Sequence, residues 1–213
     1  MNSRLITLVF SALLVSGSAV FGAIKDDILA LTGNKRTKIV WSRQVGAVNG
    51  AYGIGGTFSL MRFDTDVGTE ADVLGNTDEY FRAKLTWDGN RIVYNRHADL
   101  YVVDFTGGNN RLVGTNMALG CLWYDEQSGK QYAVVAIGSG CLTDYGNATS
   151  VPLYKVNIDD AADRILIFNN RSYNNIWMSI SRDGTKLGGS FPWSTGGILD
   201  IKTNTFKNYN QYG

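Results

Sequence analysis

Residues 85–114 read LTWDGNRIVYNRHADLYVVDFTGGNNRLVG, and this stretch decides the fold. Its apolar runs are separated by Asp88-Gly89, by His97-Ala98-Asp99 and by Gly107-Gly108. An Asp-Gly pair between runs of alternating apolar residues is a strong signal for a β-hairpin. The stretch therefore predicts short antiparallel strands joined by tight turns.

Both halves of this stretch recur along the chain. The strand–turn–strand pattern of 81–96 recurs at 118–136 and 175–191, and 37–43 resembles its second strand alone. The strand–turn–strand pattern of 100–114 recurs in three further segments, 60–75, 153–168 and 198–210. Four-stranded units at a period of roughly 40–50 residues are typical of a β-propeller.

The predicted fold is an all-β propeller of four-stranded antiparallel blades. One twisted sheet cannot cover its own faces, whereas stacked blades bury each face against a neighbour. The prediction places a partial blade at 37–75, without its first strand, and complete blades at 80–114, 118–168 and 175–210. A two-sheet sandwich also has many short strands, but it does not require the repeated order of turns.

Two features of the repeat resemble the TolB-type, WD-like propeller family. The segment Asp99-Leu-Tyr-Val-Val-Asp104, followed by Gly107-Gly108-Asn109, resembles the D-[IL]-Y-[VM]-x-D pattern of that repeat's third strand and its Gly-rich turn. The turns at 87–89 and 182–184 resemble its S-x-D-G hairpin. The resemblance covers 37–210, is best in one blade, and implies a propeller with an incomplete ring.

The ring is predicted to be incomplete because three blades and a partial one fall short of a closed set. Propellers close with about four to eight blades. The chain is therefore a fragment of a longer protein, a small closed ring, or a protein that pairs its open blade edges with another chain. We favour the fragment.

The N-terminus has the layout of a secretory signal peptide. Arg4 precedes an apolar run at 5–15, and small residues follow. Cleavage is predicted after Gly22 or Ala23, with Ala19 as a further option. We assign 1–22 to the signal peptide and 23–36 to a lead-in with a short helix at 26–31. An uncleaved membrane anchor is the alternative; otherwise the mature protein is secreted, extracellular or periplasmic, without a membrane span.

Composition excludes two classes of protein. The chain has 20 Lys and Arg against 19 Asp and Glu, a net charge of +1. This balance argues against the concentrated basic face that binds nucleic acid. A hydrophobic fraction of 44% with 18% charged residues is that of a folded domain and not of a disordered chain.

The two cysteines, Cys121 and Cys141, form either a disulfide or two buried free thiols.

Candidate site residues fall in the longer loops, which a propeller gathers around the mouth of its central channel. Aromatic side chains there can stack on sugar rings, and polar ones can bond to hydroxyl groups, although the aromatic residues could equally cap the blade ends. The short turns at the opposite face are expected to offer little. The candidates are Tyr52, Asp78, Tyr80, Arg96, His97, Asp144, Tyr145, Arg171, Tyr173 and Trp193.

The sequence contains no recognisable motif for a metal site or a cofactor. His97, the single histidine, is either a base or metal ligand at the mouth or a turn residue bonded to its own loop. One histidine cannot build a multi-histidine metal site, which counts against resemblance to the propeller-type pectate oligomer lyases. The acidic segment 64–72 fails the spacing of an EF-hand and matches a turn. No metal or cofactor is predicted.

Two functions follow from these patterns. The first is a secreted binding or scaffold domain that recognises a glycan or a protein through the mouth loops. The alternative is an exported polysaccharide-active lyase or hydrolase, which needs acid–base partners in the same mouth. Its candidate residues are Asp78, Arg96, His97, Asp144 and Arg171. The fold alone does not separate them.

Overall fold

A computed structural model describes residues 18–46, 56–138, 152–169, 178–190 and 196–208. Its elements in chain order are α1 (Ser18–Leu31), β1 (Lys38–Gln44), β2 (Phe58–Asp64), β3 (Glu70–Asp78), β4 (Tyr80–Leu85), β5 (Arg91–Arg96), β6 (Asp99–Asp104), β7 (Arg111–Gly114), β8 (Met117–Asp125), β9 (Lys130–Ile137), β10 (Leu153–Asn157), β11 (Asp160–Phe168), β12 (Ser179–Ile180), β13 (Lys186–Ser190), β14 (Gly196–Asp200) and β15 (Thr205–Asn208).

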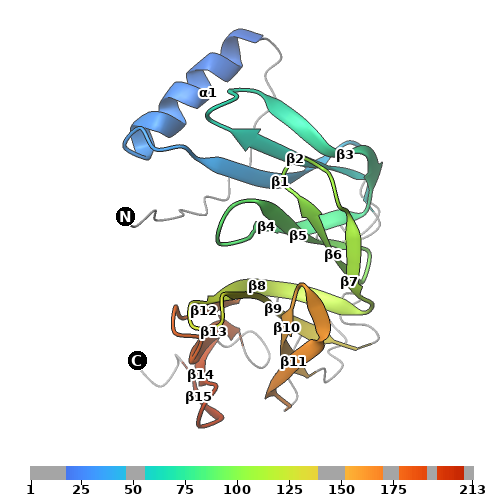
Figure 1. Ribbon diagram of the computed structural model, residues 1–213, viewed down its shortest axis with the longest axis vertical. Helices are drawn as coiled ribbons and strands as arrows, with labels where there is room; N and C mark the ends of the chain where they lie inside the picture. Colours follow the sequence, from blue (N-terminus) through green and yellow to red (C-terminus); the bar gives the residue numbers. More distant parts are fainter. Residues whose placement is uncertain (1–17, 47–55, 139–151, 170–177, 191–195, 209–213) are drawn as a thin grey trace.

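The described strands form four antiparallel sheets in a propeller-like arrangement. Blade 1 is β1-β2-β3, blade 2 is β4 to β7, blade 3 is β8 to β11 and blade 4 is β12 to β15. Within every sheet the strands lie in chain order, as the predicted up-and-down blades require. Figure 1 shows blade 1 at the top, blade 2 below it, and blades 3 and 4 in the lower half, with blade 4 on the left. The all-β propeller fold predicted from the repeats is therefore confirmed.

Strands of the inner blades are buried on both faces. Along β5, Ile92 and Tyr94 pack towards blade 1, whereas Val93 packs towards blade 3. Along β9, Val135 packs towards blade 2 and Val134 towards blade 4. Successive side chains of a strand point to opposite faces, so one strand supplies two interfaces. This explains why these strands are continuous apolar runs.

Blade 1 has three described strands and a longer third strand than predicted. The repeat predicted an end at residue 75, whereas β3 continues to Asp78. The pairing shifts between Ser59 and Met61, so that Ser59 faces Thr77 but Met61 faces Asp72. Residues 73–76 of β3 thus lie opposite the single residue Leu60, which makes a large bulge, and strand pairing resumes beyond it. This continuation brings Asp78 to the start of blade 2.

A buried amide joins blades 2 and 3. The Asn95 side chain is fully buried; its Nδ2 donates to the carbonyls of Asp99 at 3.0 Å and Met117 at 2.8 Å. Its Oδ1 accepts the N–H of Leu119 at 2.9 Å. Two of these three bonds reach β8, the first strand of the next blade. A buried polar group stabilises a fold only when it is satisfied, and this one fixes how the two blades meet.

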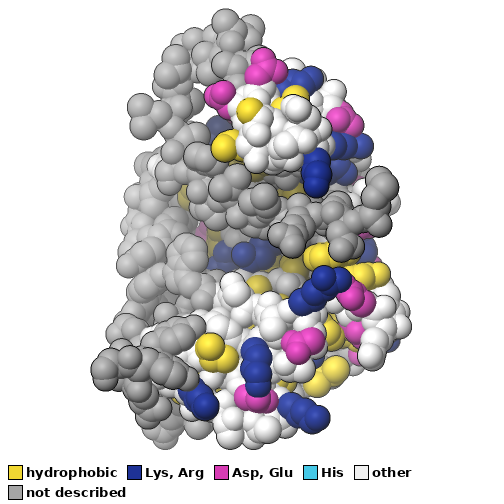
Figure 2. Space-filling model, turned by 90° about the vertical axis from the view of Figure 1, so that its left-hand side faces the viewer, with side chains coloured by type: hydrophobic (Ala, Val, Ile, Leu, Met, Phe, Trp, Pro, Cys, Tyr) yellow, Lys and Arg dark blue, Asp and Glu magenta, His cyan; other side chains and the backbone are white. Residues whose placement is uncertain are grey.

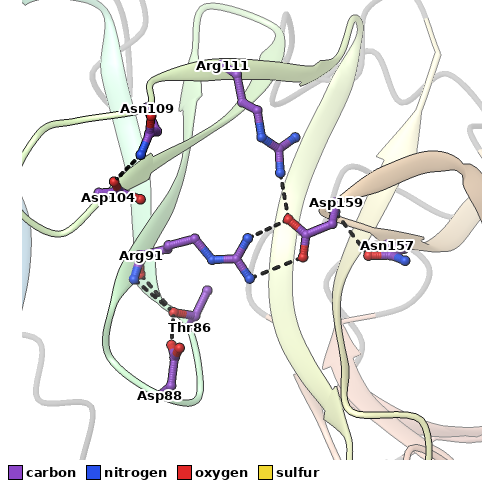
Figure 3. A network of polar contacts seen from close by, with 8 residues as sticks. All are labelled: Thr86, Asp88, Arg91, Asp104, Asn109, Arg111, Asn157 and Asp159. Atoms are coloured by element: carbon purple, nitrogen blue, oxygen red, sulfur yellow. Dashed lines mark hydrogen bonds and ion pairs between the residues drawn. The ribbon is translucent and has the colours of Figure 1, made fainter.

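An exposed ionic contact joins the same two blades further along. Asp159, in the turn between β10 and β11, accepts hydrogen bonds from Arg91 at 2.5 and 3.2 Å and from Arg111 at 2.7 Å. Both arginines belong to blade 2, and Figure 3 shows them converging on the one carboxylate. Asp159 lies half exposed, so this contact orients the blades more than it stabilises them.

Cys121 is a buried free thiol in the structure. Burial raises its pKa to about 12. This agrees with the free-thiol alternative at Cys121; Cys141 lies outside the described residues. The Cys121 side chain packs into the apolar interface with blade 4, beside Met178 and Leu187. Its role in this structure is therefore packing.

Helix α1 covers more of the chain than the short helix predicted at 26–31. It begins at Ser18 and so runs through the predicted cleavage positions; residues 1–17 lie outside the described part. Gly33, with a φ of 64°, follows its end as a helix-terminating residue. Within the described residues, no helix combines the length and apolar character needed to cross a membrane.

The contact between blades 1 and 2 predicts a difference between two glycine variants. A Cβ on Gly107, whose φ is 99°, would lie 2.1 Å from the Val73 carbonyl oxygen of β3, whereas a Cβ on Gly75, at φ 70°, meets nothing within 4 Å. Gly75→Ala should cost about 1–2 kcal/mol of backbone strain. Gly107→Ala should cost about 1–3 kcal/mol more, because the blades must separate. Urea unfolding measures both, and equal losses would contradict this packing.

Candidate functional site

Three of the predicted mouth residues form one ionic cluster. Asp78 receives hydrogen bonds from Arg96, with Nε at 2.7 Å and Nη2 at 2.6 Å, on a single carboxylate oxygen. The other oxygen lies 3.0 Å from Nε2 of His97. The second ring nitrogen of His97, Nδ1, lies 3.1 Å from a carboxylate oxygen of Glu79. The imidazole therefore bridges two carboxylates; both bonds form together only when it is protonated.

The backbone holds this cluster in place. Arg96 and Asp99 pair across the β5–β6 hairpin, whose loop is His97-Ala98, and His97 adopts a positive φ of 51°. The His97 N–H donates to the Glu79 carbonyl at 3.1 Å. The Ala98 carbonyl accepts the N–H of Met117 at 2.9 Å, which ties the loop to blade 3. The loop is thus anchored to the connection before blade 2 and to the following blade.

The charges of the cluster favour an ionised Asp78. Partial burial acts to raise the pKa of Asp78, but the N–H of Glu79 and the Arg96 guanidinium outweigh it and lower the pKa. The same contact with Asp78 raises the pKa of Arg96. Asp78 is therefore a structural acceptor at neutral pH. The exposed parts of the cluster are the side chains of Arg96, at 41%, and His97, at 59%.

Tyr80 does not face the mouth, contrary to its prediction as a ligand-binding residue. It is 1% exposed, and its ring meets Tyr94 edge-on at a centroid distance of 5.7 Å. Its hydroxyl donates to Oδ1 of Asn76 at 3.0 Å. Tyr80 is the first residue of β4, and its side chain lies on the face towards blade 1, so its ring packs into the apolar interface between the two blades. Tyr80 therefore supports the site through packing.

The other predicted candidates cannot be placed relative to this cluster. They lie outside the described residues: Tyr52, Asp144, Tyr145, Arg171, Tyr173 and Trp193. Sequence reasoning identified Asp78, Arg96 and His97 but missed Glu79. The signal was available, because Glu79 adjoins Asp78 in the connection before β4.

The face with the short turns carries more than the sequence predicted. Trp87, in the β4–β5 turn, is 48% exposed, and its ring stacks parallel to that of Tyr124 at a centroid distance of 6.0 Å. Two hollows also open among these turns, one between blades 1 and 2 and one between blades 3 and 4. Figure 2 views the side towards which the β4–β5 turn projects and shows Lys and Arg side chains spread over it, interspersed with Asp and Glu. These turns thus carry an exposed aromatic pair and two hollows that the sequence did not predict.

The described ranges contain no group of three or more His, Cys, Asp and Glu side chains placed to hold a metal ion. His97, Asp78 and Glu79 instead satisfy one another.

Comparison with known proteins supports the fold. No family model matches the sequence, and no curated protein matches it. Among solved structures, a TolB-type protein from Agrobacterium tumefaciens matches 79% of this chain and 61% of its own, with 12% identity and a TM-score of 0.50. TolB from Acinetobacter baumannii matches 92% of this chain and 60% of its own, with 15% identity and a TM-score of 0.45.

An oligogalacturonate lyase from Vibrio parahaemolyticus is a further structural neighbour. It matches 72% of this chain and 42% of its own, with 11% identity and a TM-score of 0.48. The chain thus spans between 42% and 61% of the length of these three structures. At such identities the likeness is one of fold alone.

The Asp78 contacts predict a pH-dependent effect of Asp78→Asn. The folded-state pKa of Asp78 is lowered, so its stabilisation is present above its unfolded pKa and is lost as pH falls through the folded pKa. The variant should lose about 1 kcal/mol of unfolding free energy at neutral pH, since the ion pair is partly exposed. The difference from the native protein should shrink below about pH 4.

Urea unfolding across this pH range measures the effect. Asp160→Asn is the matched control, because the Asp160 side chain is exposed and accepts a local bond from the Ala162 N–H. It should change stability by less than about 0.5 kcal/mol. A loss at Asp78 that persists undiminished in acid would contradict the ion-pair assignment.

Proposed function

We propose that this chain is a secreted binding domain that recognises a glycan or a protein at its mouth face. The observation that carries the proposal is the pairing of Arg96 and His97 with carboxylates of their own chain. Such pairing holds both side chains in fixed positions while leaving them partly exposed. Fixed donors suit recognition, because little conformational entropy is lost on binding.

The chemistry of these donors suits hydroxyl and carboxylate groups. Arg96 keeps guanidinium N–H donors beyond those that Asp78 accepts, and a guanidinium matches planar acceptors. Loops on a rigid scaffold are the usual place for such contacts. A sugar or an acidic loop of a partner protein supplies matching acceptors.

The contact between His97 and Glu79 favours one alternative, an exported polysaccharide-active lyase or hydrolase. An imidazole oriented by a carboxylate is an arrangement that serves general base catalysis. Asp78 opposes it, because its carboxylate lies 3.0 Å from the other ring nitrogen, Nε2, and occupies the position from which a substrate proton would have to be taken. We therefore rank recognition above catalysis.

Substitution at His97 separates the two functions. The full chain would be tested for binding to, and cleavage of, polygalacturonate and cellulose, as acidic and neutral polysaccharides. For a binding domain, His97→Gln and Arg96→Met should each weaken binding by about tenfold, the value of one charge-assisted hydrogen bond, with no product released. For an enzyme, His97→Gln should reduce turnover by about 10²-fold or more.

Arg182→Met is the matched control. Arg182 forms a comparable exposed ion pair with Glu126 at 2.7 Å, but among the short turns between blades 3 and 4. It should leave mouth binding unchanged. Unaltered binding in the Arg96 and His97 variants would remove the mouth cluster from the site, and cleavage lost in His97→Gln alone would establish the enzyme.

We also propose that the protein is exported and that β1 is completed by further β-structure. In the described part of blade 1, β1 pairs with β2 on one side and forms the edge of the sheet. An unpaired edge is a template for another strand. Intact mass spectrometry and light scattering of the natural secreted protein should show either a mass above that of residues 23–213 or a dimer. A stable monomer of residues 23–213 would contradict this proposal.

A further inference from the structure

A hollow of about 500 Å³ opens between blades 1 and 2 among the short turns. Blade 1 lines it with β1 and β2, and blade 2 with the β4–β5 turn and the end of β6. Four lining side chains are cationic and two are carboxylates, so the hollow carries an excess of positive charge. The lining cations and carboxylates are Arg36, Lys38, Arg62, Arg91, Asp64 and Asp104.

The carboxylates are engaged by other groups. Asp64 is 3% exposed and forms a two-point contact with Arg36, with Nε at 3.1 Å and Nη2 at 2.6 Å. Burial acts to raise the pKa of Asp64, but the bond from Arg36 and the nearby positive charges outweigh it and lower the pKa. Asp104 accepts a bond from Nδ2 of Asn109 at 2.6 Å. Arg91 is held by Asp159, as Figure 3 shows.

Two cations lack a carboxylate partner among the described residues. The Lys38 ammonium donates to the carbonyl of Gly89 at 2.8 Å and lies 4.7 Å from the centre of the Phe105 ring. The Arg62 guanidinium lies 5.3 Å from the same ring. Phe105 itself is buried, at 4% exposure. Lys38 and Arg62 thus share one aromatic ring at the hollow.

Arg62 also carries an unsatisfied atom. Its Nε is buried and has no hydrogen-bond partner among the described residues. A buried N–H of a charged group without an acceptor is costly, and the Phe105 ring is the contact that stabilises the Arg62 side chain here. An oxyanion within the hollow would supply the negative charge that Lys38 and Arg62 lack among the described residues.

We propose that this hollow binds the oxyanion group of a small ligand, a carboxylate or a phosphate, between Lys38 and Arg62. Charge-assisted hydrogen bonds from the ammonium and the guanidinium hold the oxyanion, and the Phe105 ring positions both cations. Gly107 contributes by allowing the β6–β7 turn to touch β3, which sets the separation of the two blades. The site lies apart from the mouth cluster and does not depend on it.

Isothermal titration calorimetry of the full chain, with three probes, tests the proposal. Inorganic phosphate and glucuronate represent the two oxyanion sources, and glucose is the neutral counterpart of glucuronate. At least one oxyanion should bind with one-to-one stoichiometry and more weakly as salt is raised, and glucose should not bind. The stronger oxyanion identifies the source; absence of saturable binding by either would overturn the proposal.

Variants locate the binding. Lys38→Met and Arg62→Met should each lower the affinity for the probe by about tenfold or more, which corresponds to the loss of one charge-assisted hydrogen bond. Arg62→Lys keeps the charge but removes the guanidinium, so it should retain part of the affinity. It also tests the site in a variant that disturbs the fold less than Arg62→Met.

Lys202→Met is the charge-matched control, in the exposed β14–β15 turn of blade 4. It should leave the affinity unchanged. Affinity equally reduced in Lys202→Met would show general electrostatic attraction, and affinity unchanged in folded Lys38 and Arg62 variants would place the anion elsewhere. Either result would overturn the proposal.

Discussion

Burial of the central strands on both faces is the constraint on which the rest of the structure depends. A strand such as β5 contributes Ile92 to one interface and Val93 to the next, so each apolar core is shared by two blades. Removing water from each sheet face requires a neighbouring blade, because the hydrophobic effect stabilises a fold only through apolar area that is covered. The relative position of the blades therefore determines the shape of every surface between them.

Polar contacts select one position among the many that apolar packing would allow. Hydrophobic contact is non-directional, whereas Asn95 must meet Met117 and Leu119 within hydrogen-bond distance. The same interface carries the Arg91–Asp159–Arg111 contact near its exposed edge. A buried amide with all its bonds made gives the blades one register, and the exposed ions add to it.

The two ends of the blades have different polar chemistry. At the mouth, Arg96 and His97 are paired with neighbouring carboxylates, which gives a rigid surface. In the hollow among the short turns, Lys38 and Arg62 have no such partners within the described residues, and positive charge remains. The first arrangement suits a ligand with many hydroxyl groups, and the second suits an anion. Both lie at the ends of strands, where the blades stop covering one another.

The sequence by itself determined the strands, the turns and the blade order, because alternation and Asp-Gly turns are local signals. It also placed Asp78, Arg96 and His97 among the loops at the mouth, since they end or precede strands; their contacts with one another came from the structure. Only the tertiary structure decided that Tyr80 is buried, because its exposure depends on which face meets blade 1. The hollow was equally unpredictable. Lys38 and Arg62 belong to two strands of blade 1, whereas Phe105 follows β6 of blade 2, and only the packing of those blades sets the distances between them.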